Sequence, residues 1–137
     1  MNRDEIKTFL PHREPMLLVD EIELDGSGNA IGSYTVQGDE WFLQGHFPGD
    51  PVVPGVVLCE MIAQTAGALL REQLPGKTTL YAGIDEVRFR RMVRPGDTVK
   101  ITCRIARQKL NVYVIAGEAS VLDTLCVKGT FTLMLAG

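Results

Sequence analysis

The stretch from Gly55 to Leu74 constrains the fold more than any other part of this sequence. It contains no proline, is dominated by helix formers, and is bounded by Pro54 and by Pro75-Gly76, which favour a helix start and a helix stop. Its apolar side chains occupy nearly every side of the predicted helix. A helix that is apolar all round in a globular chain is a buried one, so the rest of the chain has to cover it.

The segments on either side of this helix have the patterns of strands and turns. Before it we predict a short helix at 4–10, a strand at 17–24, a turn at 25–29 and a returning strand at 30–37. After it we predict four strands, at 79–88, 98–107, 111–121 and 125–135. The sequence therefore predicts an α+β architecture, an antiparallel sheet wrapped around one long central buried helix.

The length and composition are those of one globular domain. The chain has 137 residues, of which 45% are hydrophobic and 23% charged, and we place no domain boundary in 1–137. The charged opening and the short apolar runs favour a soluble cytoplasmic protein, with neither a membrane nor a nucleic acid as partner. Three widely spaced cysteines and two histidines give no disulfide framework and no metal-binding pattern.

The charge is unevenly distributed along the chain. The net charge is −3, yet the segment 88–109 holds eight basic residues and a single acid, Asp97. Such a basic segment in an acidic protein suggests an acidic partner, because the local field steers association. Solvated faces of predicted strands explain the same pattern equally well.

Glu60 is the strongest candidate for chemistry. It lies in the second turn of the apolar helix, where carboxylates are rarely buried unless paired. Burial without a close cation would raise its pKa and suit it to donate a proton near neutral pH. Gln64 lies four residues on and shares its face, so the amide is expected to orient the carboxyl. A carboxylate satisfied by the helix N-terminus, or one that reaches solvent, is the alternative.

His46 is the second candidate, in a loop rich in glycine and proline. It stands between Gly45 and the tripeptide Phe47-Pro48-Gly49, which we expect to support the site. Histidine is the side chain best suited to take and return protons near neutral pH. A solvated or structural role is common for a loop histidine. At the helix start, the amide of Gly55 has no acceptor within the helix and could stabilise a developing oxyanion. Gly55 is equally explained by backbone freedom alone.

Three blocks of the sequence resemble the FabZ-type 3-hydroxyacyl-[acyl-carrier-protein] dehydratases. They are LPHREPMLLVD at 10–20, GHFPGDPVVPGV at 45–56 followed by Glu60 and Gln64, and AGIDEVRFRR with VRPGD at 82–91 and 93–97. The resemblance implies a hot-dog fold that acts as a homodimer and often as a trimer of dimers, with His46 of one subunit near Glu60 of the other. By analogy, His46 removes the α-proton, Glu60 protonates the leaving β-hydroxyl, and the Gly55 amide polarises the thioester carbonyl.

The same resemblance implies a partner and a cofactor requirement. Acyl carrier protein would dock on the basic segment, and its phosphopantetheine arm arrives with the substrate, so no metal and no dissociable cofactor is needed. The docking candidates are Arg88, Arg90, Arg91 and Arg94.

The sequence departs from the family pattern at Glu14, Trp41 and Met92, none of which is the proposed acid or base. FabA-type relatives, which also isomerise the double bond, usually carry Asp where this chain has Glu60, so the sequence favours a plain dehydratase. A bifunctional dehydratase and isomerase remains an alternative. A hot-dog thioesterase and a non-catalytic acyl-binding subunit are further alternatives, disfavoured by the presence of both His46 and Glu60.

Overall fold

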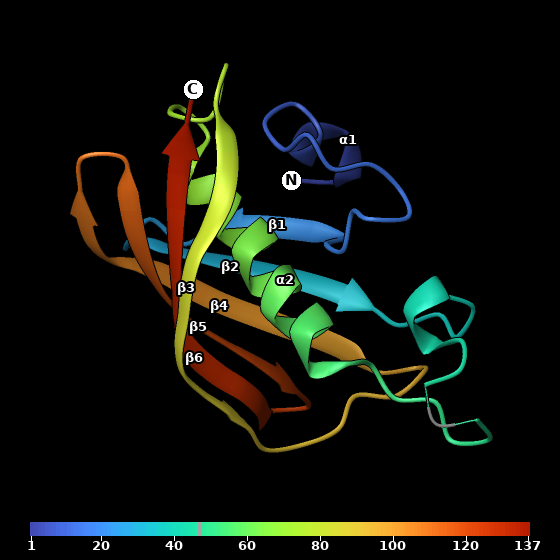
Figure 1. Cartoon of the computed structure of the whole chain (residues 1–137). Helices are drawn as coiled ribbons and strands as arrows, with labels where there is room; N and C mark the ends of the chain where they lie inside the picture. Colours follow the sequence, from blue (N-terminus) through green and yellow to red (C-terminus); the bar gives the residue numbers. More distant parts are fainter. Residues whose placement is uncertain (47) are drawn as a thin grey trace.

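A single six-stranded antiparallel sheet curves around one helix (Figure 1). The computed structural model describes residues 1–46 and 48–137. The strand order across the sheet is β1-β2-β4-β5-β6-β3. The elements, in chain order, are α1 Arg3–Ile6, β1 Glu21–Leu24, β2 Asn29–Thr35, η1 Trp41–Leu43, α2 Gly55–Ala66, η2 Gly67–Leu70, β3 Thr78–Phe89, β4 Thr98–Lys109, β5 Val112–Val121 and β6 Thr124–Ala136.

The central helix begins where the sequence predicts and ends earlier. Pro54 is its N-cap and α2 starts at Gly55, but the regular helix stops at Ala66 and tightens into η2, Gly67–Leu70. A Cβ at Gly67 would lie 2.6 Å from Leu10 Cδ2, so the glycine permits a close approach of the N-terminal segment at this point. Glycine weakens the α-helix and 3₁₀ turns are common at helix ends, which explains why the single helix predicted for 55–74 is shorter.

Two glycines of the sheet let α2 lie close to the strands. A Cβ at Gly32 in β2 would lie 2.5 Å from Thr65 Oγ1, and one at Gly117 in β5 would lie 2.4 Å from Ile62 Cγ2. Thr65 and Ile62 are both fully buried on α2. Side chains at these two sheet positions would push the helix away, so the glycines set the distance between the two layers.

The helix is not buried on every side, contrary to the expectation from its composition. Val56 is 72% exposed, and Glu60 and Ala63 are partly exposed. These residues are spaced i, i+4 and i+7 and therefore form one stripe along α2. The single chain buries the opposite side of the helix against the sheet and leaves this stripe open.

The other predicted elements are present with shifted ends. The predicted strand at 17–24 begins only at Glu21, because the Leu18 amide donates to the Gln64 side chain at 2.8 Å instead of to a neighbouring strand. The helix predicted at 4–10 ends at Ile6. The tight β5–β6 turn at Leu122 and Asp123, both with positive φ, has no glycine or proline to signal it.

The β3 strand is an edge of the sheet and is exposed along nearly all of its length. It pairs with β6 on one side only, and it carries Leu80, Tyr81 and Ile84, each at least 41% exposed. A long edge strand with apolar side chains is a surface that natural proteins normally cover. In the part of the chain that the structure describes, no helix is long and apolar enough to cross a membrane.

Candidate active site

Glu60 lies in the second turn of α2 with its carboxyl held by Gln64. The Gln64 Nε2 donates to Glu60 Oε2 at 2.9 Å, as the spacing of four residues predicts. Gln64 is itself only 1% exposed; it accepts from the Leu18 amide and donates to the Met16 carbonyl at 2.9 Å. The Glu60 side chain remains 25% exposed, so it is neither fully buried nor fully solvated. An apolar helix thus presents one oriented carboxyl at a partly open position.

The sequence reasoning missed His12 as a neighbour of Glu60. The His12 Nε2 lies 3.5 Å from Glu60 Oε2, and the His12 side chain is 29% exposed. Both residues line a cavity of about 80 Å³ whose other walls are mainly apolar: Leu10, Ala63, Gln64, Gly67, Leu70, Leu74, Thr79, Tyr81 and Leu133. His12 and Glu60 are far apart in the sequence, and no periodicity links a loop residue to a helical one. Only the fold reveals the pair.

Tyr81 closes the cavity from the β3 side. Its hydroxyl donates to the Cys59 carbonyl at 3.0 Å. Burial raises the pKa of Tyr81, and the nearby Glu60 carboxylate raises it further, so the phenol keeps its proton. Burial also raises the pKa of the Cys59 thiol, which gives no support to a nucleophilic cysteine beside Glu60.

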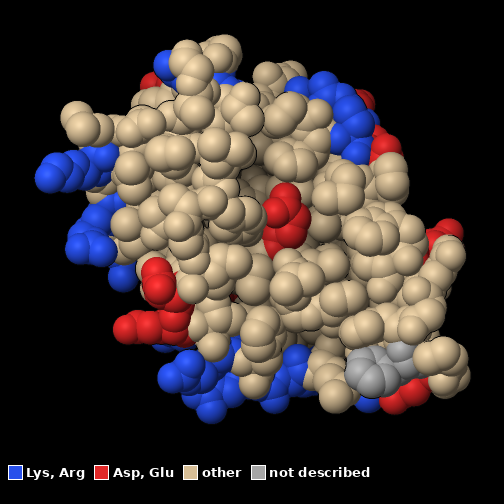
Figure 2. Space-filling model, in the orientation of Figure 1, with Lys and Arg blue, Asp and Glu red and all other residues tan. Residues whose placement is uncertain are grey.

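The surface around this carboxyl is largely free of charge. Figure 2 shows acidic atoms in a hollow near the middle of an uncharged face, over α2, and Glu60 is the one acidic residue of that helix. Tyr81, which lines the cavity beside Glu60, is 41% exposed, and Leu80 and Ile84 on the same edge strand are exposed as well. Exposed apolar side chains beside a cavity are typical of an interaction surface or a ligand groove.

His46 lies in the loop that leads to α2. Its Nδ1 is 2.7 Å from the Val52 carbonyl, and its amide donates to the Leu43 carbonyl at 3.2 Å. Gly45 and Gly49 have φ of 77° and 86°, values that favour glycine, so the loop shape depends on both. Pro48 is exposed in the same loop. Phe47, which was also expected to support the site, lies outside the described residues.

Among the described residues, the hydrogen bond and the ion-pair contact of Glu60 are with Gln64 and His12, and neither of these belongs to the His46 loop. That loop is fastened elsewhere: the Val53 amide donates to the Val93 carbonyl at 2.8 Å, and Asp50 accepts from Arg94 Nε at 3.1 Å. The two candidate proton-transfer groups therefore belong to separate regions of the chain.

Gly55 stands at the first position of α2, against an aromatic ring. A Cβ at Gly55 would lie 2.5 Å from Phe89 Cε1, so a side chain there would have to displace the Phe89 ring. The amide of a first helical residue has no acceptor within the helix and lies at the positive end of the helix dipole. Gly55 is thus needed for close packing, and its amide remains a candidate donor to a substrate oxygen.

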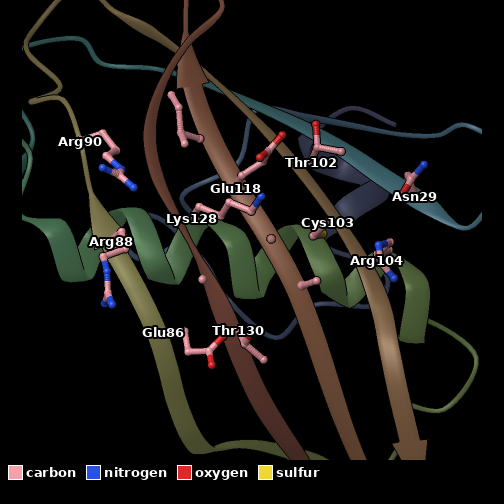
Figure 3. A pocket seen from close by; sticks show the side chains of 14 residues that line it. Asn29, Glu86, Arg88, Arg90, Thr102, Cys103, Arg104, Glu118, Lys128 and Thr130 are labelled. Carbon is pink, nitrogen blue, oxygen red and sulfur yellow. The ribbon is translucent and has the colours of Figure 1, made fainter.

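The structure divides the four predicted docking arginines into two pairs. Arg91 lies 3.4 Å from Asp97 and Arg94 lies 3.1 Å from Asp50, so both are in ion pairs. Arg88 and Arg90 instead line a hollow of about 380 Å³ together with Arg104 and Lys128, on the face of the sheet opposite α2 (Figure 3). We call Arg88, Arg90, Arg104 and Lys128 the outer basic cluster. None of the four is in a salt bridge among the described residues.

The titratable groups around Glu60 are suited to proton transfer. In residues 1–46 and 48–137, no three His, Cys, Asp or Glu side chains gather closely enough to hold a metal ion. One oriented carboxyl, a neighbouring imidazole and a small, mainly apolar cavity favour acid–base chemistry on a substrate with an apolar part.

Comparison with known proteins places this geometry in a family. The model of the FabA-like domain matches residues 10–130. A curated relative from Chloroflexus aggregans, named 3-hydroxyacyl-[acyl-carrier-protein] dehydratase FabZ, is 45% identical over 88% of this chain and 86% of its own length. A relative of the same name from Moorella thermoacetica is 42% identical over 94% of this chain and 92% of its own.

Solved structures confirm the fold. A chain of the dehydratase heterocomplex ApeI:P from Xenorhabdus doucetiae is 22% identical and superimposes with a TM-score of 0.82, covering 96% of this chain and 91% of that one. The PaaI protein of Escherichia coli is 18% identical with a TM-score of 0.65, covering 83% and 81%. A hypothetical thioesterase of Streptococcus pneumoniae, 17% identical with a TM-score of 0.64, covers 85% of each chain. Since a dehydratase and a thioesterase share this likeness, it shows the hot-dog fold and leaves the chemistry to the site.

Proposed function

The chain belongs to the FabA-like family and, within it, to the FabZ-type 3-hydroxyacyl-[acyl-carrier-protein] dehydratases, and we propose that Glu60 and His46 carry out its reaction. The reaction is the dehydration of a (3R)-3-hydroxyacyl thioester on acyl carrier protein to the trans-2-enoyl thioester, a step of fatty acid elongation. The observation that carries the assignment of Glu60 is its carboxyl, oriented by buried Gln64 and facing a mainly apolar cavity.

The two side chains suit complementary proton transfers. The contact of His46 Nδ1 with the Val52 carbonyl requires a hydrogen on Nδ1, which places the imidazole lone pair on Nε2, the nitrogen that would take the α-proton. As the α-carbon loses this proton, the double bond forms and the β-carbon–oxygen bond breaks. Glu60 gives a proton to the departing hydroxyl, which leaves as water. The Gly55 amide would polarise the thioester carbonyl while charge develops on its oxygen. The proposed reaction needs no metal or dissociable cofactor.

A second copy of the chain would supply the missing histidine. The β3 edge is open along its length, and it adjoins the uncharged face and the exposed stripe of α2 at Val56, Glu60 and Ala63. Pairing of β3 with β3 of a copy about a two-fold axis would cover these surfaces in one interface. We infer that the site is completed in this homodimer, with Glu60 from one subunit and His46 from the other.

The outer basic cluster is the favoured docking surface for acyl carrier protein. Along β3 the side chains alternate, so Arg88 belongs to the outer face while Phe89 packs against Gly55 at the start of α2. A carrier held at Arg88 and Arg90 would lie beside the strand end that adjoins the helix start, where its phosphopantetheine arm could pass toward Glu60. Glu86 and Glu118 also line this hollow, but no salt bridge ties the four cations among the described residues, so their charge is available to an acidic surface.

The reaction is tested by following a short 3-hydroxyacyl-carrier-protein with the purified chain and identifying the products by mass and double-bond position. Formation of a 2-enoyl product with the thioester intact supports the dehydratase. An additional 3-enoyl product would add isomerase activity, and release of free thiol would indicate a thioesterase. No turnover from well-folded dimer would contradict the proposed function.

The shared site is tested by mixing two inactive variants, His46→Ala and Glu60→Gln, and letting their subunits exchange. If the site is shared, each mixed dimer contains one site with both native groups, and random exchange restores about a quarter of the native sites. If both groups come from one chain, every site lacks one of them and the mixture stays inactive. Co-purification of two differently tagged variants is the control that exchange occurred.

A further inference from the structure

We propose that His12 is a positioning residue that, with Gln64, fixes which oxygen of Glu60 carries the acid proton. The inference rests on the proposed role of Glu60 as the proton donor. Both neighbours lie on the same oxygen: Gln64 Nε2 is 2.9 Å from Oε2 and His12 Nε2 is 3.5 Å from it. In the described part of the chain, no hydrogen bond from Gln64 or His12 reaches the other oxygen, Oε1.

The hydrogen-bond pattern around Gln64 fixes its role as a donor. Its Oε1 accepts from the Leu18 amide at 2.8 Å, and its Nε2 donates to the Met16 carbonyl at 2.9 Å. A backbone amide can only donate and a backbone carbonyl can only accept, so the side-chain amide cannot be turned over without losing both bonds. Its second Nε2 hydrogen must then be donated to Glu60 Oε2. That oxygen is an acceptor in both charge states of the carboxyl, and the acid proton is left to Oε1.

His12 is suited to donate to the same oxygen. Its Nδ1 is buried and has no hydrogen-bond partner in residues 1–46 and 48–137. A hydrogen on Nδ1 would be a buried donor without an acceptor, so the tautomer with its hydrogen on Nε2 is favoured. This Nε2–H lies beside Glu60 Oε2, and two donors on one oxygen leave the proton-bearing Oε1 as the atom that faces a substrate hydroxyl.

The loop that carries His12 is held firmly enough to position a side chain. The Arg13 guanidinium donates to the carbonyls of Leu10 and His12 at 2.9 and 2.7 Å, and the Met16 amide donates to the Arg13 carbonyl at 2.7 Å. At 3.5 Å the contact of His12 with Glu60 is longer than a strong hydrogen bond. Contacts of this kind tighten in the substrate complex, so the donor acts when the cavity is filled.

The experiment compares His12→Leu, which removes the donor, with His12→Gln, whose amide nitrogen can take the position of the imidazole Nε2. The steady-state constants and the midpoint of thermal unfolding are measured for both, and Glu14→Gln serves as a control for disturbance of the same loop. For His12→Leu we expect kcat to fall by about 10- to 100-fold, the scale of misplacing a reacting group, with KM unchanged. For His12→Gln we expect most of kcat to return.

The outcomes separate this inference from the proposed function. A His12→Leu enzyme with the kcat of the native chain overturns the role of His12. The proposed reaction would still be supported in that case by turnover of the native chain and inactivity of the Glu60→Gln variant. Equal losses of kcat in His12→Leu and His12→Gln at unchanged thermal stability also overturn the role of His12, because a hydrogen-bond donor at this position would then make no difference. If His12→Leu lowers thermal stability, the kcat values of the two variants are compared at equal folded fraction. A higher kcat in His12→Gln then supports the role of His12, and an equal kcat overturns it. Absence of turnover in the native chain contradicts the proposed function itself.

Discussion

The two faces of the sheet differ in the charged side chains that lie on them. The face toward α2 is mainly apolar, and the helix that covers it carries one carboxyl, Glu60, which is held by Gln64 beside His12. The opposite face carries Arg88, Arg90, Arg104 and Lys128 around an open hollow (Figure 3). Alternation along the strands sorts one sequence into these two surfaces, because successive side chains point to opposite sides of a sheet. An oriented group needs partners that fix its geometry, whereas a docking surface needs charges that remain available.

The largest expected effect is at the oriented carboxyl. Glu60→Gln keeps the size of the side chain and removes the acid, so we expect turnover to fall by at least ~100-fold while the thermal unfolding midpoint changes little. Steady-state kinetics and thermal unfolding of the same preparation check both parts. Near-normal turnover in this variant would remove Glu60 from the mechanism and leave the helix face without a reactive group.

The two faces should also differ in how much a substitution to alanine changes the stability of the protein. In Gly117→Ala the new Cβ would lie 2.4 Å from Ile62 Cγ2, so the helix layer must move, and we expect a loss of about 1–3 kcal/mol in the free energy of unfolding. The matched control, Glu118→Ala, alters the adjacent exposed residue and should stay within about 0.5 kcal/mol of the native value. Urea unfolding measures both variants, provided that the slope of the unfolding free energy against urea concentration stays the same. Equal losses of unfolding free energy would show that the two faces are not packed differently.

Substitutions in the two arginine pairs, Arg88 with Arg90 and Arg91 with Arg94, should have different effects, because we expect the first pair to bind the carrier protein and the second to hold loops in place. Reversing Arg88 and Arg90 to Glu is expected to raise KM about tenfold for the carrier-bound substrate and to leave a short pantetheine thioester unaffected, because docking charges steer the encounter. Arg94→Glu removes the ion pair with Asp50 in the His46 loop and should slow both substrates alike. An equal loss with both substrates for the Arg88 and Arg90 reversal would mean that the site, and not the dock, was damaged.

The smallest effect is expected at an exposed ion pair near the His12 loop. The Lys7 ammonium, with help from Arg3, lowers the pKa of Glu14 to about 2 from a usual 4.5. A carboxyl whose pKa is lower in the folded state contributes stability above pH 4.5 and loses that contribution as the pH falls toward 2. The difference in unfolding midpoint between the native chain and Glu14→Gln should therefore be small at pH 7 and vanish near pH 2. A difference in unfolding midpoint that grows as the pH falls would contradict a lowered pKa of Glu14 in the folded state.

Local patterns were sufficient for most of the fold. The proline and glycine boundaries and the apolar run predicted the start of α2 at Gly55, and β-strand patterns predicted the strands around it. They failed at the start of β1, because the Leu18 amide donates to the Gln64 side chain instead of to a strand. They also failed at the end of α2, where Gly67 lies against Leu10 and the regular helix stops. Periodicity describes one element at a time, and these outcomes depend on a contact between two.

The candidate site shows the same division. The rarity of a carboxylate on an apolar helix was enough to single out Glu60, and spacing alone predicted its contact with Gln64. The sequence could not predict that His12 lies 3.5 Å from Glu60. Nor could it predict that, within the described residues, Arg91 and Arg94 are ion-paired while Arg88 and Arg90 are not. Residue type and spacing along the chain determined which chemistry is available. The tertiary structure decided which groups meet, because the distance between segments far apart in sequence is set by the packing of the helix against the sheet.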